Sequence, residues 1–412
     1  MLMSGNLLTA DQVATRLGVQ RATVYAYVSR GLLHRTVGDD GRTSWFDTDE
    51  VDGLARRGRP RTRSQRAGAV EVVLASGLTR IADGSLVYRG HDVADLVGRV
   101  PFEAVAELLW TGVLPDAEPT GWPVPAAELA VAHAATATLP VTSPIAARLA
   151  VAVAAVAAAD EARGDLRPDT VRRKARTMLS VFARTPLAVG TAPEPLRARP
   201  VATELWPRVS AQRPTSARLR TLDAALVLLA DHELATSTLA ARVAASTRAN
   251  PYACVLAAIG AVSGPLHGRA AIGTHRILAE ALATGNPAAA VNGALEAQER
   301  IPGFGHVLYD GVDPRATLLL DRVDGIAGAA TGRTIDSVRR VAVDATGAEP
   351  NIDFALGALA VAGAMPFGAT EGIFAIGRTA GWIGHVLEEY DERPLRYRPR
   401  AIYTGATEPD RP

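Results

Sequence analysis

Long stretches rich in Ala, Leu and Val, separated by Pro or Gly, follow one another from Val70 onward. Apolar stretches of this length are typical of buried or half-buried helices. The pattern predicts helices at residues 102–110, 126–137, 145–162, 216–249, 271–283 and 372–389. We expect one β-hairpin, at residues 78–88, because Asp83-Gly84 interrupts a short run of strand-forming residues. The predicted fold class is therefore all-α.

The beginning of the chain has a different pattern. Thr9 can cap a helix over residues 11–17, and a second helix is predicted for residues 20–30. Asp39-Asp40-Gly41 then makes a turn between two short strands. This order of elements resembles the winged helix-turn-helix of the MerR and excisionase families, which implies a DNA-binding domain at residues 1–55. The alternative is a helical appendage that only packs on the rest of the protein.

A basic segment follows this domain. Residues 56–69 hold six arginines and no acidic residue, together with Gly and Pro, a composition typical of a solvated linker. Residues 1–66 contain 11 Arg and seven Asp or Glu, a net charge of +4, whereas the whole chain carries +1. Because basic residues bind nucleic-acid phosphates, DNA is a candidate partner for residues 1–66.

The composition is that of a globular protein rather than a disordered or membrane-spanning one. Of 412 residues, 48% are hydrophobic and 21% charged. The longest apolar run, residues 149–159, is too short to cross a bilayer, and the first eight residues lack the features of a signal peptide. The single cysteine, Cys254, excludes an intrachain disulfide. We expect a cytoplasmic protein without membrane association.

Four residues stand in settings that favour chemistry. His267 and His306 both lie in glycine-rich turns, and although one such histidine is more often structural, two within 40 residues favour a functional site. Asp353 lies between apolar neighbours, where burial raises the pKa of a carboxyl toward that of a useful base. Arg378 interrupts an apolar helix and needs an acidic partner or an anionic ligand such as a dicarboxylate. No spacing of His, Cys and Asp suggests a metal site.

Several motifs resemble those of citrate synthases and occur in the order of that family, nearly at its spacing. They are residues 83–90, 107–115, 230–238, 264–268, 303–306, 313–316, 351–354 and 398–400. The resemblance extends over residues 70–405 and implies an all-α homodimer. It further implies a large domain at residues 70–270 and 373–412, a small domain at residues 271–372, and an active site in the cleft between them.

The resemblance implies a Claisen condensation of acetyl-CoA with oxaloacetate, followed by hydrolysis of the thioester to citrate and CoA. Asp353 would be the base, His267 the hydrogen-bond donor to the enolate oxygen, and His306 the donor to the ketone oxygen of oxaloacetate. The residues that would bind the oxaloacetate carboxylates are His232, Arg315, Arg378 and, from the second subunit, Arg398. Acetyl-CoA is a substrate in this reaction, and neither a cofactor nor a metal is implied.

The sequence departs from the family pattern on the CoA side. Arg269 replaces a glycine, Asp310 replaces a basic residue that contacts a CoA phosphate, Ala355-Leu356 replaces Tyr-Ser, and Ser143-Pro144-Ile145 replaces His-Pro-Met. Three functions therefore stay open. The first is a citrate synthase, the second a 2-methylcitrate synthase that uses propionyl-CoA, and the third a metabolite-sensing DNA-binding regulator built on a citrate synthase body.

Overall fold

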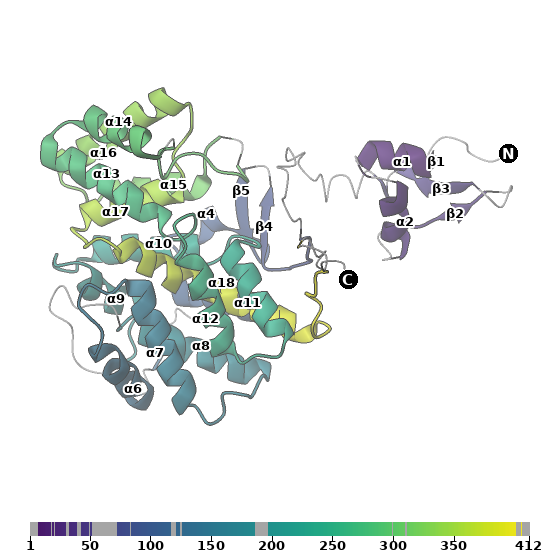
Figure 1. The fold of residues 1–412 in the computed structure, drawn as a ribbon, viewed down its shortest axis with the longest axis horizontal. Coiled ribbons are helices and arrows are strands. Elements are labelled where there is room, and N and C mark those ends of the chain that lie inside the picture. Colours follow the sequence, from purple (N-terminus) through teal and green to yellow (C-terminus); the bar gives the residue numbers. More distant parts are fainter. Residues whose placement is uncertain are drawn as a thin grey trace, which may run out of the picture. The chain divides into compact units, whose positions relative to one another are not determined.

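A computed structural model describes residues 7–17, 19, 21–29, 33–38, 43–48, 50–51, 72–82, 84–116, 121–123, 126–185, 197–298, 300–309, 311–400 and 405. The chain divides into two compact units, Met1–Leu74 and Ala75–Pro412. Each contains helices and a small three-stranded sheet (Figure 1). The predicted linker at residues 56–69, the turn at residues 39–41 and Asp310 lie outside the described residues.

The N-terminal unit contains two short helices and an antiparallel sheet. Its elements are β1 (Leu7–Thr9), α1 (Ala10–Leu17), α2 (Arg21–Ser29), β2 (Thr36–Val37) and β3 (Ser44–Asp47), with strand order β1-β3-β2. The predicted cap is present, since the Gln12 backbone N–H donates to Thr9 Oγ1 at 3.3 Å and the Thr9 N–H donates to Gln12 Oε1 at 2.8 Å. Val13, Val24 and Phe46 are fully buried between helices and sheet. The DNA-binding role of this unit stays a prediction.

The second unit is mostly helical, as predicted. A sheet of order β4-β5-β6 (Thr79–Ala82, Ser85–Tyr88 and His91–Asp92) includes the expected hairpin. The helices are α4 (Val93–Leu96), α5 (Phe102–Thr111), α6 (Ala126–Ala137), α7 (Ile145–Ala159), α8 (Pro168–Phe182), α9 (Val201–Val209), α10 (Ser216–Leu229), α11 (Thr236–Ser246), α12 (Pro251–Val262), α13 (Ala270–Thr284), α14 (Pro287–Gln298), α15 (Pro314–Asp324), α16 (Ala329–Thr346), α17 (Ile352–Ala362) and α18 (Ala369–Asp391).

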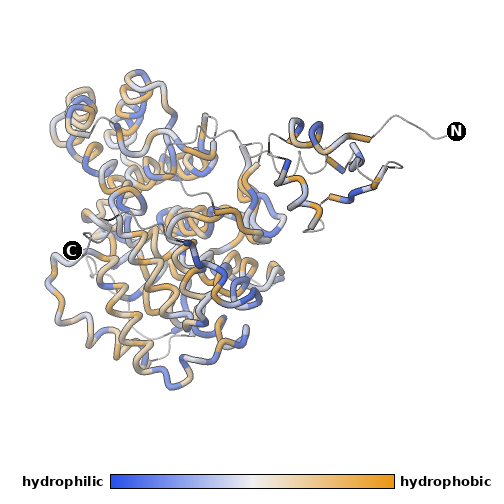
Figure 2. The backbone as a smooth tube through the Cα atoms, turned by 45° about the vertical axis from the view of Figure 1, so that its right-hand side comes forward, coloured by the Kyte–Doolittle hydropathy of each residue, from blue (hydrophilic) through white to orange (hydrophobic). Residues whose placement is uncertain are grey.

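Helix α18 is at the centre of this unit. It packs against α5, α7, α8 and α10 to α12, and it also contacts α13 and α17, which belong to a second group of helices, α13 to α17 (Figure 1). Its residues are buried almost continuously from Ala369 to Val386, because neighbours surround it on all sides. Figure 2 shows apolar stretches along these closely packed helices. In the described part of the chain, no helix is long and apolar enough to span a membrane.

The prediction of one continuous helix at residues 216–249 is wrong. The chain breaks between α10 and α11, where Glu233 adopts a positive φ of 53°. The carbonyls that would continue α10 are bound by α18 instead: Arg378 Nε donates to the Leu229 oxygen at 2.7 Å and the Gly381 N–H to the Ala230 oxygen at 2.8 Å. The predicted helix at residues 145–162 is also too long, since α7 ends at Ala159.

The contact between this break and α18 leaves no room for a side chain at Gly381. A Cβ there would lie 2.3 Å from Asp231 Oδ1 and 2.4 Å from the Ala230 oxygen. We expect Gly381→Ala to lower the free energy of unfolding by roughly 1–3 kcal/mol, the usual scale of overpacking. Urea unfolding measures this change. The matched control is Gly293→Ala in α14, where a Cβ meets nothing within 4 Å. Because alanine favours a helix more than glycine does, this variant should raise the free energy of unfolding by about 0.5–1 kcal/mol. Equal changes in the two variants would contradict overpacking as the cause at Gly381.

Candidate active site

The residues predicted to carry chemistry lie at helix ends and in loops of the second unit, with one exception inside α18. His232 lies in the break between α10 and α11, and His267 between α12 and α13. His306 precedes α15, Arg315 is the second residue of α15, and Asp353 is the second residue of α17. Arg378 lies in the middle of α18.

Backbone hydrogen bonds join the His306 loop to the start of α17. The Asn351 N–H donates to the Gly303 oxygen, and Asn351 Nδ2 donates to the Gly305 oxygen, both at 2.8 Å. Gly303 has a φ of 86°, and a Cβ at this position would lie 3.0 Å from the Phe354 nitrogen. Glycine is thus required there for both conformation and close approach. Asn351 also caps α17 by accepting from the Asp353 N–H at 2.9 Å, which fixes the position of Asp353.

Asp313 connects the ends of α15 and α17. Its Oδ1 and Oδ2 accept from Arg315 Nε and Nη2 at 3.0 and 2.8 Å, a bidentate pair, and Oδ2 also accepts from the Ile352 N–H at 3.0 Å. These contacts, with the Arg315 charge opposing burial, hold the pKa of Asp313 below its ordinary value. Arg315 is only 2% exposed, so its guanidinium is oriented within the protein rather than by solvent.

Three rings gather beside Arg315. The ring centroids of His232 and His306 are 5.1 Å apart, and that of Tyr309 is 4.9 Å from His306. His232 Nε2 and Tyr309 Oη form a hydrogen bond of 3.0 Å. Burial, together with the charges of Arg315 and Arg378, lowers the pKa of His232 well below its ordinary value. His232 is therefore neutral at pH 7.

The hydrogen bonds of His306 select its tautomer. The Leu308 backbone N–H donates to His306 Nδ1 at 3.0 Å, so the proton of the neutral ring lies on Nε2. Arg315 Nη2 lies 3.3 Å from Nε2. Since both atoms carry protons in this tautomer, that contact is not a hydrogen bond, and the Nε2 proton remains available to an acceptor. Burial, then the Arg315 charge, lowers the pKa of His306 to about 4.

His267 contacts residues of α11 and α18. Ser237 Oγ lies 2.8 Å from His267 Nε2, and the Phe374 ring lies 5.6 Å from the imidazole in an edge contact. Burial, then the Arg378 charge, lowers the pKa of His267 to about 4. The imidazole is thus neutral at pH 7, and its Nδ1 has no hydrogen-bond partner in the described part of the chain.

Arg378 is a buried cation without a carboxylate partner. It is 1% exposed, donates from Nε to the Leu229 oxygen, and lies 4.8 Å over the Phe374 ring. No carboxylate of the described residues lies within salt-bridge distance of its guanidinium. A buried guanidinium in this state is a strong binding group for an anion, because its remaining N–H groups are already oriented.

Asp353 has the features of a base. Its Oδ1 is buried and has no hydrogen-bond partner in the described part of the chain. Burial raises the pKa of Asp353 to about 6, although the charges of Arg315 and Arg378 oppose the rise. A carboxylate with this pKa accepts a proton more readily than one in water, yet is still ionised at pH 7.

Arg398 and Arg269 are not part of this cluster. Arg398 is exposed in the segment that follows α18, where Arg396 Nε and Tyr397 Oη bind Glu389 at 2.7 and 2.9 Å. Arg269 is half-exposed and lies 4.0 Å from Glu371. Glu371 has a pKa raised by burial. No group of His, Cys, Asp and Glu in the described residues could hold a metal ion.

The sequence alone did not assign roles to Ser237, Tyr309, Phe374 and Trp382. Ser237 and Tyr309 bind the predicted histidines directly, and Trp382 Nε1 donates to Ser237 Oγ at 3.2 Å. The spacing of Phe374 and Trp382, each one helical turn from Arg378, was the available signal that they share its face.

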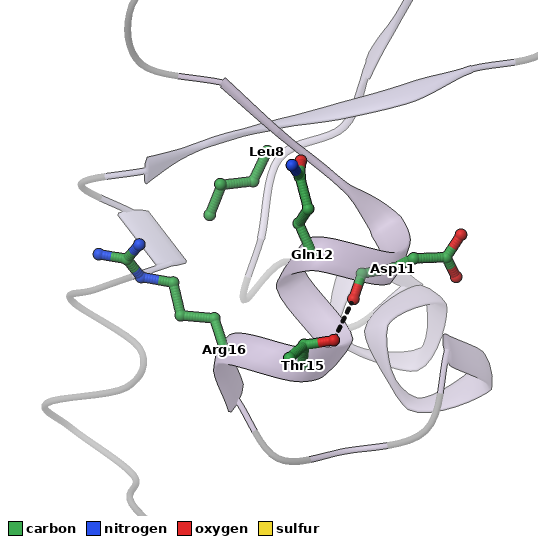
Figure 3. A pocket seen from close by; sticks show the side chains of 5 residues that line it. All are labelled: Leu8, Asp11, Gln12, Thr15 and Arg16. Atoms are coloured by element: carbon green, nitrogen blue, oxygen red, sulfur yellow. Dashed lines mark hydrogen bonds between the residues drawn. The ribbon is translucent and has the colours of Figure 1, made fainter.

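The N-terminal unit has a pocket of its own along α1 (Figure 3). Leu8, Asp11, Gln12, Thr15 and Arg16 line it, and Thr15 Oγ1 donates to the Asp11 carbonyl at 2.9 Å. None of the residues predicted to carry chemistry lines this pocket.

Comparison with known proteins identifies relatives of the chain. Residues 69–400 match the family model described as "Citrate synthase, C-terminal domain". Citrate synthase 2 of Bacillus subtilis is 30% identical over 355 residues, 81% of this chain and 94% of that protein. 2-Methylcitrate synthase 1 of Corynebacterium glutamicum is 29% identical over 357 residues, 79% of this chain and 90% of that protein. The structure of a ternary complex of Thermoplasma acidophilum citrate synthase with carboxymethyl coenzyme A and oxaloacetate is similar at a TM-score of 0.69 and 26% identity, over 82% of this chain and 96% of that one.

Proposed function

The chain belongs to the citrate synthase family, and on this premise we propose that it condenses acetyl-CoA with oxaloacetate and hydrolyses the thioester to citrate and CoA. The observation that carries the proposal is the set of groups around one site. The site contains two buried arginines, three neutral histidines and a carboxyl with a raised pKa. The charges of the arginines contribute to the pKa shifts of the histidines and of the carboxyl. This set matches the needs of a reaction between a dianion and a weak carbon acid.

The first step removes a proton from the methyl group of the thioester. Asp353 takes this proton through its unpartnered carboxylate, and the electrons move onto the thioester oxygen to form an enolate. His267 donates a hydrogen bond from Nδ1 to this oxygen. A neutral imidazole is suited to this task, because a preoriented donor lowers the cost of forming the enolate without a full charge transfer.

The second step forms the carbon–carbon bond. The enolate carbon attacks the ketone carbon of oxaloacetate, and the ketone oxygen, which becomes an alkoxide, accepts a hydrogen bond from His306 Nε2. A proton from solvent then converts the alkoxide to the hydroxyl group of the product, and His306 stays neutral. The residues that bind the oxaloacetate carboxylates are His232, Arg315, Arg378 and Arg398 of the partner subunit in a homodimer. Water then attacks the thioester carbonyl, the C–S bond breaks, and CoA leaves as the thiol.

The preference for one acyl-CoA is tested by measuring CoA thiol release with oxaloacetate and either acetyl-CoA or propionyl-CoA. Faster release from acetyl-CoA supports a citrate synthase. A preference for propionyl-CoA supports the second candidate, a 2-methylcitrate synthase, which the relative from Corynebacterium glutamicum favours. No thiol release with either substrate would contradict both.

The rate of condensation should fall as the pH decreases through about 6. Asp353 must be ionised to act as a base, and its pKa is raised to about 6, so acid removes the active form. His267 and His306, with pKa values of about 4, stay neutral over this range. The measurement is kcat/KM for oxaloacetate between pH 5 and 8, with circular dichroism at each pH as the control for unfolding. A profile that is flat down to pH 5 would oppose the assignment of Asp353.

We also propose that the N-terminal unit binds DNA, which would make the protein a metabolite-sensing regulator as well as an enzyme. Two helices followed by a β2–β3 hairpin support this proposal. On α2, Arg21 is exposed and lies 3.3 Å from Asp11, whereas Thr23 and Tyr25 are half-buried. In a dimer, two copies would act together and increase the apparent affinity.

Deletion of residues 1–66 should leave thiol release near the full-length value and abolish DNA retardation in gel shifts at low salt. The reason is that the predicted active site lies entirely in the second unit, whereas the basic residues that contact phosphates lie in the deleted part. If the full-length protein retards no DNA even at low salt, the unit is an appendage.

A further inference from the structure

Two buried side chains form a hydrogen-bond chain that ends on the predicted enolate donor, His267. Trp382 on α18 donates from Nε1 to Ser237 Oγ at 3.2 Å, and Ser237 on α11 lies 2.8 Å from His267 Nε2. Trp382 and Ser237 are both 0% exposed, so water does not compete for these hydrogen bonds. The two helices are in direct contact.

The chemistry of the donors fixes the direction of this chain. An indole N–H can only donate, so Ser237 Oγ must accept from Trp382. The hydroxyl proton of Ser237 then has one acceptor in the described part of the chain, His267 Nε2. The opposite arrangement, with His267 Nε2 donating to Ser237, would leave a buried hydroxyl proton without a partner, which is unfavourable.

We propose that Trp382 is a positioning residue that orients the Ser237 hydroxyl toward His267 Nε2 and thereby holds the proton of the neutral imidazole on Nδ1. This inference rests on the proposed function in one respect: the Nδ1 proton matters for the rate only if His267 donates to the enolate oxygen. His306 has the opposite tautomer, because the Leu308 N–H occupies its Nδ1. The two neutral histidines would thus present their protons from different ring atoms, each fixed by a separate donor.

The tautomer of His267 can be measured directly in the full-length protein. Long-range 1H–15N correlation spectra of protein labelled at its eight histidines distinguish Nδ1–H from Nε2–H, and His267→Gln identifies the signal. We expect the wild-type ring in the Nδ1–H form at pH 7. A wild-type ring in the Nε2–H form overturns the proposal, even if Trp382→Phe does not fold.

Trp382→Phe keeps an aromatic ring and removes the N–H. Without this donor the Ser237 hydroxyl can either donate to or accept from His267, so the two tautomers should mix. We expect kcat to fall about tenfold, the scale of one neutral hydrogen bond, with the KM for oxaloacetate unchanged.

The matched control is Trp110→Phe. Trp110 is also buried and donates from Nε1 at 2.8 Å, but to the Ala380 carbonyl rather than to Ser237. We expect this variant to keep the His267 tautomer and kcat. If Trp382→Phe leaves the nitrogen pattern unchanged, or if Trp110→Phe changes it equally, the positioning role is wrong. A mixed tautomer with unchanged kcat supports the positioning and contradicts the proposed role of His267 instead.

Discussion

Asp353→Asn is expected to lower kcat by at least about a hundredfold, because an amide cannot accept the proton of the thioester methyl group. The fold should survive, since Asn351 rather than the Asp353 side chain caps α17, and Asp353 Oδ1 has no hydrogen-bond partner among the described residues. The measurement is thiol release at saturating substrates, with circular dichroism as the test of folding. Near-normal turnover in folded Asp353→Asn would remove the proposed mechanism.

Asp223→Asn is a matched control for this variant. Asp223 is a partly buried carboxyl on α10, and burial raises its pKa to about 6, as for Asp353. Its Oδ1 accepts from the Phe102 N–H at 3.1 Å at the start of α5, a bond that an asparagine oxygen can keep. We expect kcat and the acid limb of the pH profile to stay as in the wild type. A loss of kcat equal to that of Asp353→Asn would show that removing any carboxylate with a raised pKa lowers activity, and would contradict a specific role of Asp353 as the base.

The helical class was predictable because long apolar stretches bounded by Pro or Gly have few other solutions in a chain of this composition. The boundaries at residues 126–137 agree with α6. The break after α10 was not predictable, because residues 216–249 are themselves suitable for one helix. Tertiary contacts determine where α10 ends, because donors on α18, about 150 positions later, bind the last carbonyls of α10.

In the candidate site, too, some features are visible in the local sequence and others depend on tertiary contacts. Glycine-rich turns and a buried charge are visible in the sequence, so His267, His306 and Arg378 could be selected there. The contacts that set their chemistry join distant segments, such as Ser237 with His267 or Leu229 with Arg378. The tautomer of His306 is set locally, by the Leu308 N–H two residues later, but the contacts of His267 and Arg378 with other segments follow only from the packing of the helices.

Arg378→Met is expected to raise the KM for oxaloacetate about a hundredfold or more. The guanidinium is buried without a carboxylate partner, and losing one partner of a buried charge pair typically costs about 2–5 kcal/mol of binding. The charge of Arg378 also lowers the pKa of Asp353. The acid limb of the pH profile should therefore move to higher pH in this variant. The KM of Arg378→Lys should lie between those of the wild type and Arg378→Met, since Lys keeps the charge but loses the planar guanidinium, which can donate two parallel hydrogen bonds to a carboxylate.

The control for Arg378→Met is Arg148→Met on α7. Arg148 is also buried, at 5% exposure, and donates to backbone carbonyls, including that of Pro140 at 2.5 Å, but it does not contact the predicted site. This variant should lower the melting temperature, because it leaves carbonyls without donors, while the KM for oxaloacetate stays unchanged. If the KM rose equally in both variants, the loss at Arg378 would reflect a general disturbance of the helices. A selective rise at Arg378 would instead identify it as a ligand of the dicarboxylate.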